Sequence, residues 1–171
     1  MRGGHAALGV LRVLVLLLAL RAAEIVLGLS PPAIASRIDL FVLYVVFRSA
    51  RSGVVDGVLI GLAVGLFRDV VSLQAVGTDL LPLAAAGAFS AWSHRKLVGE
   101  SVLGLFLILA GGVVAHDLTA GLRFIADGGS AFLTRLALDT LPAGLLTAGI
   151  GVLASEVLRA GRRRRPREAA A

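Results

Sequence analysis

The sequence lacks cysteine altogether and contains few aromatic residues. With no cysteine among its 171 residues, disulfides, thiolate zinc sites and a thiol nucleophile are excluded. One tryptophan and one tyrosine provide little material for an aromatic-lined ligand pocket. Catalytic patterns are missing as well, since no Ser–His–Asp arrangement, GxSxG elbow, HExxH helix or phosphate-binding glycine loop occurs. We therefore expect a protein that is not an enzyme and that binds neither a metal nor a cofactor.

Apolar sequence is what the chain has in excess. Hydrophobic residues make up 57% of it and its mean hydropathy is +0.91, whereas a soluble domain has about 45–50% apolar residues. A soluble fold of this size could not bury so much apolar surface. The apolar runs extend from residue 7 to residue 158, which leaves no segment for a second domain. These features predict a single all-α integral membrane domain.

Six apolar runs are separated by charged or turn-forming residues. At 1.5 Å per residue, the longer runs can cross a hydrocarbon core of about 30 Å. The expected spans cover about 7–29, 38–50, 53–69, 79–93, 101–122 and 132–158. The first run could instead be a cleaved signal peptide, although no clear small-x-small cleavage site follows it. The second is short, so it is either a span in a locally thinned bilayer or a tilted or re-entrant segment.

The positions of the basic residues predict the orientation, because Lys and Arg concentrate on the cytoplasmic side of membrane proteins. Six spans with both termini inside place only Arg37, Arg68, Arg123 and Arg135 at outer ends. The cytoplasmic ends then carry Arg2, Arg48, Arg51, Arg95, Lys96, Arg159, Arg162, Arg163, Arg164, Arg165 and Arg167. We accordingly attribute the net charge of +6 to topology and expect no nucleic-acid partner.

A basic cytoplasmic tail is expected at 159–171, after the last span. Two roles remain open for its arginines. They serve only as a topology marker, or they bind anionic lipid or an acidic cytoplasmic partner, because each basic residue near an anionic leaflet contributes about 1 kcal/mol. Within the last span, Pro142 is expected to kink the helix.

Glycine recurs at every fourth position of the third run, at Gly53, Gly57, Gly61 and Gly65. This spacing leaves one face of a helix nearly bare, and helices in membranes associate where small residues let their backbones approach. We expect this helix to be the central one, packed against the alanine-rich fourth run and the glycine pair of the fifth. A partner-binding face is the alternative.

Charged residues inside the apolar runs are costly in a membrane, so each requires a partner or a function. Arg21 and Glu24 are three residues apart and can pair on one helix face. Asp56 lies near the start of its helix, where the helix dipole and Arg48 or Arg51 can stabilise its carboxylate.

Asp39 and Asp79 are both expected in the first turn of a helix, at the positive end of its dipole. Ser36 and Thr78 are the corresponding candidates for the N-cap residues. Capping alone would explain both carboxylates.

Asp69 differs, because it is expected at the end of its helix, where the dipole is unfavourable to a carboxylate. We expect Arg68, a loop amide or the end of another span to compensate it and so clamp the outer face of the bundle. Asp139 either bonds backbone groups freed by the following proline or binds a partner. His116 and Asp117 are neighbours on one helix and point about 100° apart, so joint metal chelation is not expected.

The stretch 39–77 resembles the rod shape-determining protein MreD family of bacteria. That family has a Pro-Asp-Leu-like entry to its second span, then a glycine-rich span that closes with G-L-x-x-D and, eight residues on, a glycine. Ile38 stands where the family has proline, and Arg68 where it usually has an apolar residue. The positions that match are Asp39, Gly61, Gly65, Leu66, Asp69 and Gly77.

The resemblance implies a non-enzymatic subunit of the machinery that directs lateral cell-wall synthesis, a multi-pass protein of the bacterial plasma membrane. Family members associate with MreC and, through it, with the MreB filament and the peptidoglycan transglycosylase and transpeptidase pair. The implied six-helix transmembrane fold is similar to that of the substrate-binding subunits (S components) of energy-coupling-factor vitamin transporters. A small-molecule-binding transporter subunit is therefore the alternative function. For the scaffold function, Asp69 and Gly77 would shape the outer loop that a partner reads.

Overall fold

The computed structural model describes residues 3–28, 38–73, 75, 77–97, 101–126, 134, 138 and 140–168. Its elements are all helices, and no strand occurs in these residues. The helices are α1 (Gly3–Gly28), α2 (Leu40–Ser49), α3 (Val54–Val71), α4 (Leu80–Leu97), α5 (Val102–Ala126) and α7 (Leu141–Glu168). The expectation of an all-α bundle is confirmed for the described part of the chain.

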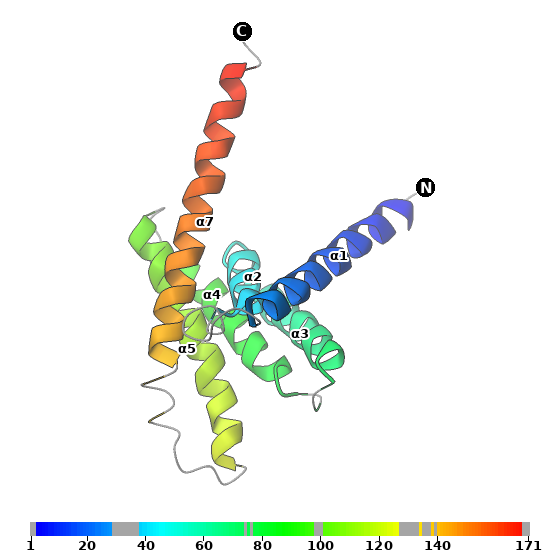
Figure 1. The fold of residues 1–171 in the computed structure, drawn as a ribbon, viewed down its shortest axis with the longest axis vertical. Helices are drawn as coiled ribbons and strands as arrows, with labels where there is room; N and C mark the ends of the chain where they lie inside the picture. Colours follow the sequence, from blue (N-terminus) through cyan, green and yellow to red (C-terminus); the bar gives the residue numbers. More distant parts are fainter. Residues whose placement is uncertain are drawn as a thin grey trace.

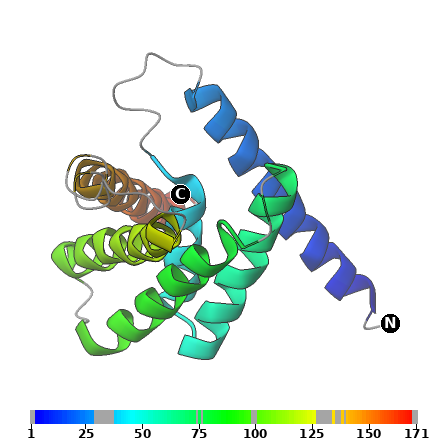
Figure 2. The ribbon, with the colours of Figure 1, turned by 90° about the horizontal axis from the view of Figure 1, so that it is seen from below.

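Helices α2 to α5 and the first part of α7 form the bundle, while α1 and the far part of α7 extend away from it toward the two chain ends (Figure 1). Seen from below, α1 and α7 lie on opposite sides of the bundle (Figure 2). Successive helices of the bundle run antiparallel. The start of α2, the end of α3 and the start of α4 therefore share one end of the molecule.

The shortest helix, α2, is the hub of the fold. It contacts each of the other helices, α1, α3, α4, α5 and α7. Phe41, Val42, Val45 and Val46 on it are all 0% exposed. At 1.5 Å per residue its 10 residues extend about 15 Å, roughly half of a hydrocarbon core. The second apolar run thus contributes a short internal helix that other helices surround.

The expectation that the third run is the central helix is wrong. Its glycine face meets one neighbour, α4, while Val55, Leu59 and Val70 on its other side are exposed. A stripe of glycines lets one helix approach closely, but it does not surround α3 with others. The face of α3 opposite its glycines carries branched and long apolar side chains, and this face is exposed.

The contact between α3 and α4 is a contact of backbones. A Cβ added to Gly57 would lie 2.6 Å from the carbonyl oxygen of Gly87, and one added to Gly65 would lie 2.5 Å from the Cα of Leu80. At Gly61 the added atom would overlap the carbonyl oxygen of Leu83. Gly53 is different, because it is the N-cap of α3 and its nearest neighbour would be 3.4 Å away. Three of the four glycines therefore make the close approach possible.

One described stretch, Val102–Leu122 in α5, is long and apolar enough to cross a membrane by length and composition. Helix α1 is also long, but Arg12, Arg21 and Glu24 interrupt its apolar sequence. Helix α3 carries Asp56, Arg68 and Asp69 in the same way. Arg68 and Asp69 contribute to the site described below, and Glu24 approaches it.

Helix α7 includes much of the expected last span and extends beyond its end. Positions 138 and 140, just before Leu141, are π-helical, and Pro142 lies in the first α-helical turn that follows them. The helix continues to Glu168 and includes Arg162, Arg163, Arg164 and Arg165. Most of the expected basic tail is thus helical and continuous with α7, since alanine and arginine favour continuation of an existing helix.

Candidate functional site

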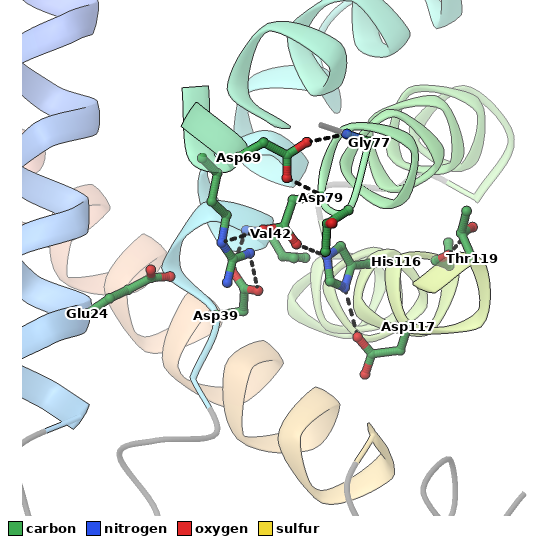
Figure 3. Close-up of polar contacts among 12 residues, drawn as sticks. Glu24, Asp39, Val42, Asp69, Gly77, Asp79, His116, Asp117 and Thr119 are labelled. Carbon is green, nitrogen blue, oxygen red and sulfur yellow. Dashed lines mark hydrogen bonds and ion pairs between the residues drawn. The ribbon is translucent and has the colours of Figure 1, made fainter. Parts of the chain in front are cut away.

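Charged side chains of α3 and of the helix starts beside it meet at one end of the bundle (Figure 3). Arg68, in the last turn of α3, is the central cation. Its Nη1 lies 2.7 Å from Oδ2 of Asp39, and its Nε lies 3.3 Å from Oδ2 of Asp79. Its guanidinium carbon also lies 5.3 Å from the ring centre of Phe41, a cation–π contact. One side chain thus joins the starts of α2 and α4 to the end of α3.

Asp39 is the N-cap of α2. Its Oδ1 accepts a 2.9 Å hydrogen bond from the backbone N–H of Val42, while Oδ2 accepts from Arg68. The sequence predicted Asp39 inside the first turn, three positions after Ser36 as the cap. Ser36 lies outside the described residues. An aspartate favours the N-cap position because its carboxylate accepts from an otherwise unpaired N–H.

Asp69 is completely buried, at 0% exposure, in the last turn of α3. Its Oδ2 accepts from the N–H of Gly77 at 2.7 Å, and its Oδ1 accepts from the N–H of Asp79 at 2.8 Å. The expected compensation by a loop amide is confirmed. Although Asp69 is at the unfavourable end of α3, it faces the positive end of α4, which begins at Leu80.

The turn between α3 and α4 depends on Gly77. Its φ is 99°, in the left-handed region that side chains rarely adopt. This conformation directs the Gly77 N–H toward Asp69 (Figure 3). Gly65 lies beneath the same turn, because a Cβ on it would be 2.8 Å from the carbonyl oxygen of Asp79.

His116 extends the cluster to α5. Its Nδ1 lies 2.8 Å from Oδ1 of Asp117, and its Nε2 lies 3.9 Å from Oδ1 of Asp79 (Figure 3). Sequence reasoning missed this arrangement, since it treated helix neighbours as pointing apart. The Asp117 carboxylate nevertheless reaches the ring of the residue before it. The neighbouring helix start then brings Asp79 to the opposite side of the ring.

Glu24 approaches the cluster from α1 (Figure 3). The predicted pair on this helix is confirmed, with Nη1 of Arg21 3.3 Å from Oε2 of Glu24. Helix α1 has few other buried side chains: Leu17 belongs to the apolar core, and Leu20 packs against it.

The structure separates the predicted residues into groups. Asp39, Asp69 and Gly77 belong to the cluster, and Gly65 and Gly61 follow from it along the contact between α3 and α4. The remaining residues lie elsewhere: Gly53 and Gly57 toward the other end of α3, and Arg162, Arg163, Arg164 and Arg165 in the far part of α7.

Two other predicted residues do not take part in the cluster. Asp56 accepts a weak hydrogen bond from Gly53 N–H at 3.4 Å, so it stabilises the start of α3 through the backbone. Asp139 lies outside the described residues.

Sequence reasoning also missed the partners of Arg68, which it considered as an outer-end basic residue, a possible compensation for Asp69 and a departure from a family pattern. Its partner Asp39 is 29 residues away along the chain. The antiparallel order of the helices was the available indication, because it places the end of α3 beside the starts of α2 and α4.

The cluster is suited to holding charges in place. In the described part of the chain, no group of three or more His, Cys, Asp or Glu side chains is arranged to hold a metal ion. The cluster can fix helix ends relative to one another, and its imidazole can exchange a proton. No family model matches this chain, and neither does any curated protein or solved structure.

Proposed function

We propose that this chain is a multi-pass protein of the bacterial plasma membrane and a non-enzymatic scaffold of the cell-wall elongation machinery. Its partners would be an MreC-like protein and, indirectly, an MreB-like filament and the peptidoglycan synthases. The observation that carries the proposal is that four of the six residues behind the resemblance, Asp39, Gly65, Asp69 and Gly77, lie at one end of α3. Asp69 bonds Gly77, and Gly65 packs under the same turn.

The surface of the molecule supports the membrane part of the proposal. Helix α1 exposes apolar side chains on every side, among them Val10, Leu11, Val15 and Leu18. Soluble monomers rarely expose apolar patches larger than a few hundred Å². Lipid would cover such a helix without cost.

The distribution of charge supports the proposed orientation. The acidic cluster lies at the start of α2 and α4, while Arg48, Arg95 and Lys96 lie in the last turns of these helices. Basic residues on the cytoplasmic side would place the cluster toward the outer side, with both termini inside.

Leu73 supports the outer turn as the surface that a partner reads. It has a φ of 53°, a conformation that costs a residue other than glycine about 1 kcal/mol or more. Its side chain is nevertheless an exposed leucine, at 93% exposure. Strained backbone conformations are often found at functional sites. The side chain of Leu73 is exposed and does not pack in the fold, so a contact with a partner would explain the strain.

Replacing Leu73 with asparagine tests this surface. Asparagine tolerates the left-handed conformation, so the melting temperature in detergent should stay unchanged or rise slightly. Co-purification of wall-synthesis proteins from crosslinked membranes, measured by quantitative mass spectrometry, should fall about tenfold if roughly 1.4 kcal/mol of contact is lost.

The matched control is Leu103→Asn, at a leucine of 67% exposure near the start of α5, at the other end of the bundle. This variant should co-purify the same proteins as the unmodified chain. Equal recovery with Leu73→Asn would contradict the docking role of the turn. Recovery of a transport ATPase and its coupling subunit in place of wall-synthesis proteins would contradict the scaffold function.

A further inference from the structure

His116 holds an unpaired polar atom in the interior of the charged cluster. The residue is 8% exposed, and its Nε2 is buried without a hydrogen-bond partner. Three other buried side-chain atoms of the described residues share this condition, on Ser49, Ser93 and Thr147. Those three are hydroxyls, which do not take up a proton in the physiological range. Nε2 of His116 is thus the unpaired atom that can change its charge.

The contacts of the His116 ring indicate which of its two nitrogens carries hydrogen. A carboxylate offers acceptors alone, so the ring nitrogen 2.8 Å from Asp117 carries hydrogen and donates it. In a neutral ring, Nε2 then has a lone pair, and it faces Oδ1 of Asp79 at 3.9 Å. Two acceptors therefore face one another across a buried space. A proton between them converts this repulsion into a charge-assisted contact.

Two carboxylates lie beside the ring, Asp117 of α5 and Asp79 at the start of α4. Arg68 of α3 binds Asp79 and also Asp39, the N-cap of α2. The remaining charged neighbours of the cluster are matched locally: Asp69 by two backbone N–H groups, and Glu24 by Arg21.

With a neutral ring, Asp117, Asp79 and Asp39 carry three negative charges against the single positive charge of Arg68, which leaves negative charge in excess. Charge interactions are stronger in such a poorly hydrated place than in water. The excess is reduced by one unit when the ring is protonated.

We propose that His116 and Asp79 form a proton-binding site that links α5 to the start of α4. One proton is taken up between Nε2 of His116 and Oδ1 of Asp79, and Asp117 holds the ring on its other side. Because Asp79 also binds Arg68 and its N–H binds Asp69, uptake of the proton would tighten the ends of α2, α3 and α4 together. This site goes beyond the scaffold function and does not depend on any partner.

Nitrogen NMR of the full-length protein tests the site directly. The chain has three histidines, so ¹⁵N-histidine labelling gives few signals, and substitution assigns them. A titration in lipid nanodiscs over about pH 5 to pH 8 should show the His116 Nε2 signal change from a bare to a protonated nitrogen. The Nδ1 signal of the same ring should remain protonated throughout. A His116 ring that keeps a bare Nε2 over this range would overturn the proposal.

Thermal unfolding provides the second measurement. The unmodified protein should melt at least about 3 °C higher at the acidic end of the titration than at the basic end, corresponding to about 1 kcal/mol for a chain of this size. His116→Gln should lose this difference, while His94→Gln, near the far end of α4, should keep it. The same pH dependence in His116→Gln would contradict the proposal. If His116→Gln does not fold, the NMR titration of the unmodified protein decides alone.

Discussion

Replacing Arg68 with methionine should destabilise the bundle by about 3–5 kcal/mol, the usual effect of removing one partner from a buried ion pair. Methionine fills a similar volume, but Asp39 and Asp79 would lose their shared cation. The side chain of Arg68 is only 18% exposed, so water cannot replace it fully. The measurement is the free energy of unfolding in mixed detergent micelles, compared with that of the unmodified protein.

A set of companion variants separates charge from shape. Arg68→Lys keeps the charge, but lysine lacks the planar guanidinium that contacts two carboxylates at once. The stability of this variant should therefore lie between that of the unmodified protein and that of Arg68→Met. Adding Asp39→Asn and Asp79→Asn to Arg68→Met removes the uncompensated charges and should restore much of the lost stability. If Arg68→Met alone is as stable as the unmodified protein, the cation does not hold the helix ends together.

Replacing Gly61 with leucine should separate α3 from α4 and cost about 3 kcal/mol or more, at the upper end of overpacking effects. Even the first carbon of the new side chain would overlap the carbonyl oxygen of Leu83, and backbone cannot move aside as a flexible side chain can. Stability in detergent and co-purification of partner proteins should fall together, because the outer turn lies at the end of the same contact.

The matched control for this change is Gly149→Leu in α7, where an added Cβ would have no atom within 4 Å. That variant should retain its stability. Unchanged stability and unchanged partner recovery in Gly61→Leu would contradict the close packing of α3 on α4.

The sequence was sufficient to predict helices, and it was not sufficient to predict which helix is central. Apolar runs and their charged ends locate the helices, because both follow from local composition. Helix α2 is the hub although its run is the shortest, and the glycine pattern suggested α3 instead. A glycine stripe indicates how closely one neighbouring helix can approach. How many neighbours surround a helix depends on the whole arrangement, which no single run encodes.

The site was predictable where its contacts are local. Asp69 and Gly77 are eight residues apart, and a carboxylate at a helix end has to find a nearby donor. The contacts of Arg68 and His116 join different helices, so they depend on how far each helix extends past its neighbour. Asp79, which both residues approach, was interpreted from sequence only as a helix-start residue.

The central claim is that the chain crosses the membrane several times, with the turn after α3 outside and the end of α4 inside. The absence of cysteine makes a direct measurement possible, because a single introduced thiol is the only one present. Leu73→Cys and Lys96→Cys are treated with a membrane-impermeant maleimide in spheroplasts. We expect labelling at position 73 in intact spheroplasts and at position 96 only after permeabilisation. Labelling of position 96 in intact spheroplasts, or of position 73 only after permeabilisation, would contradict it.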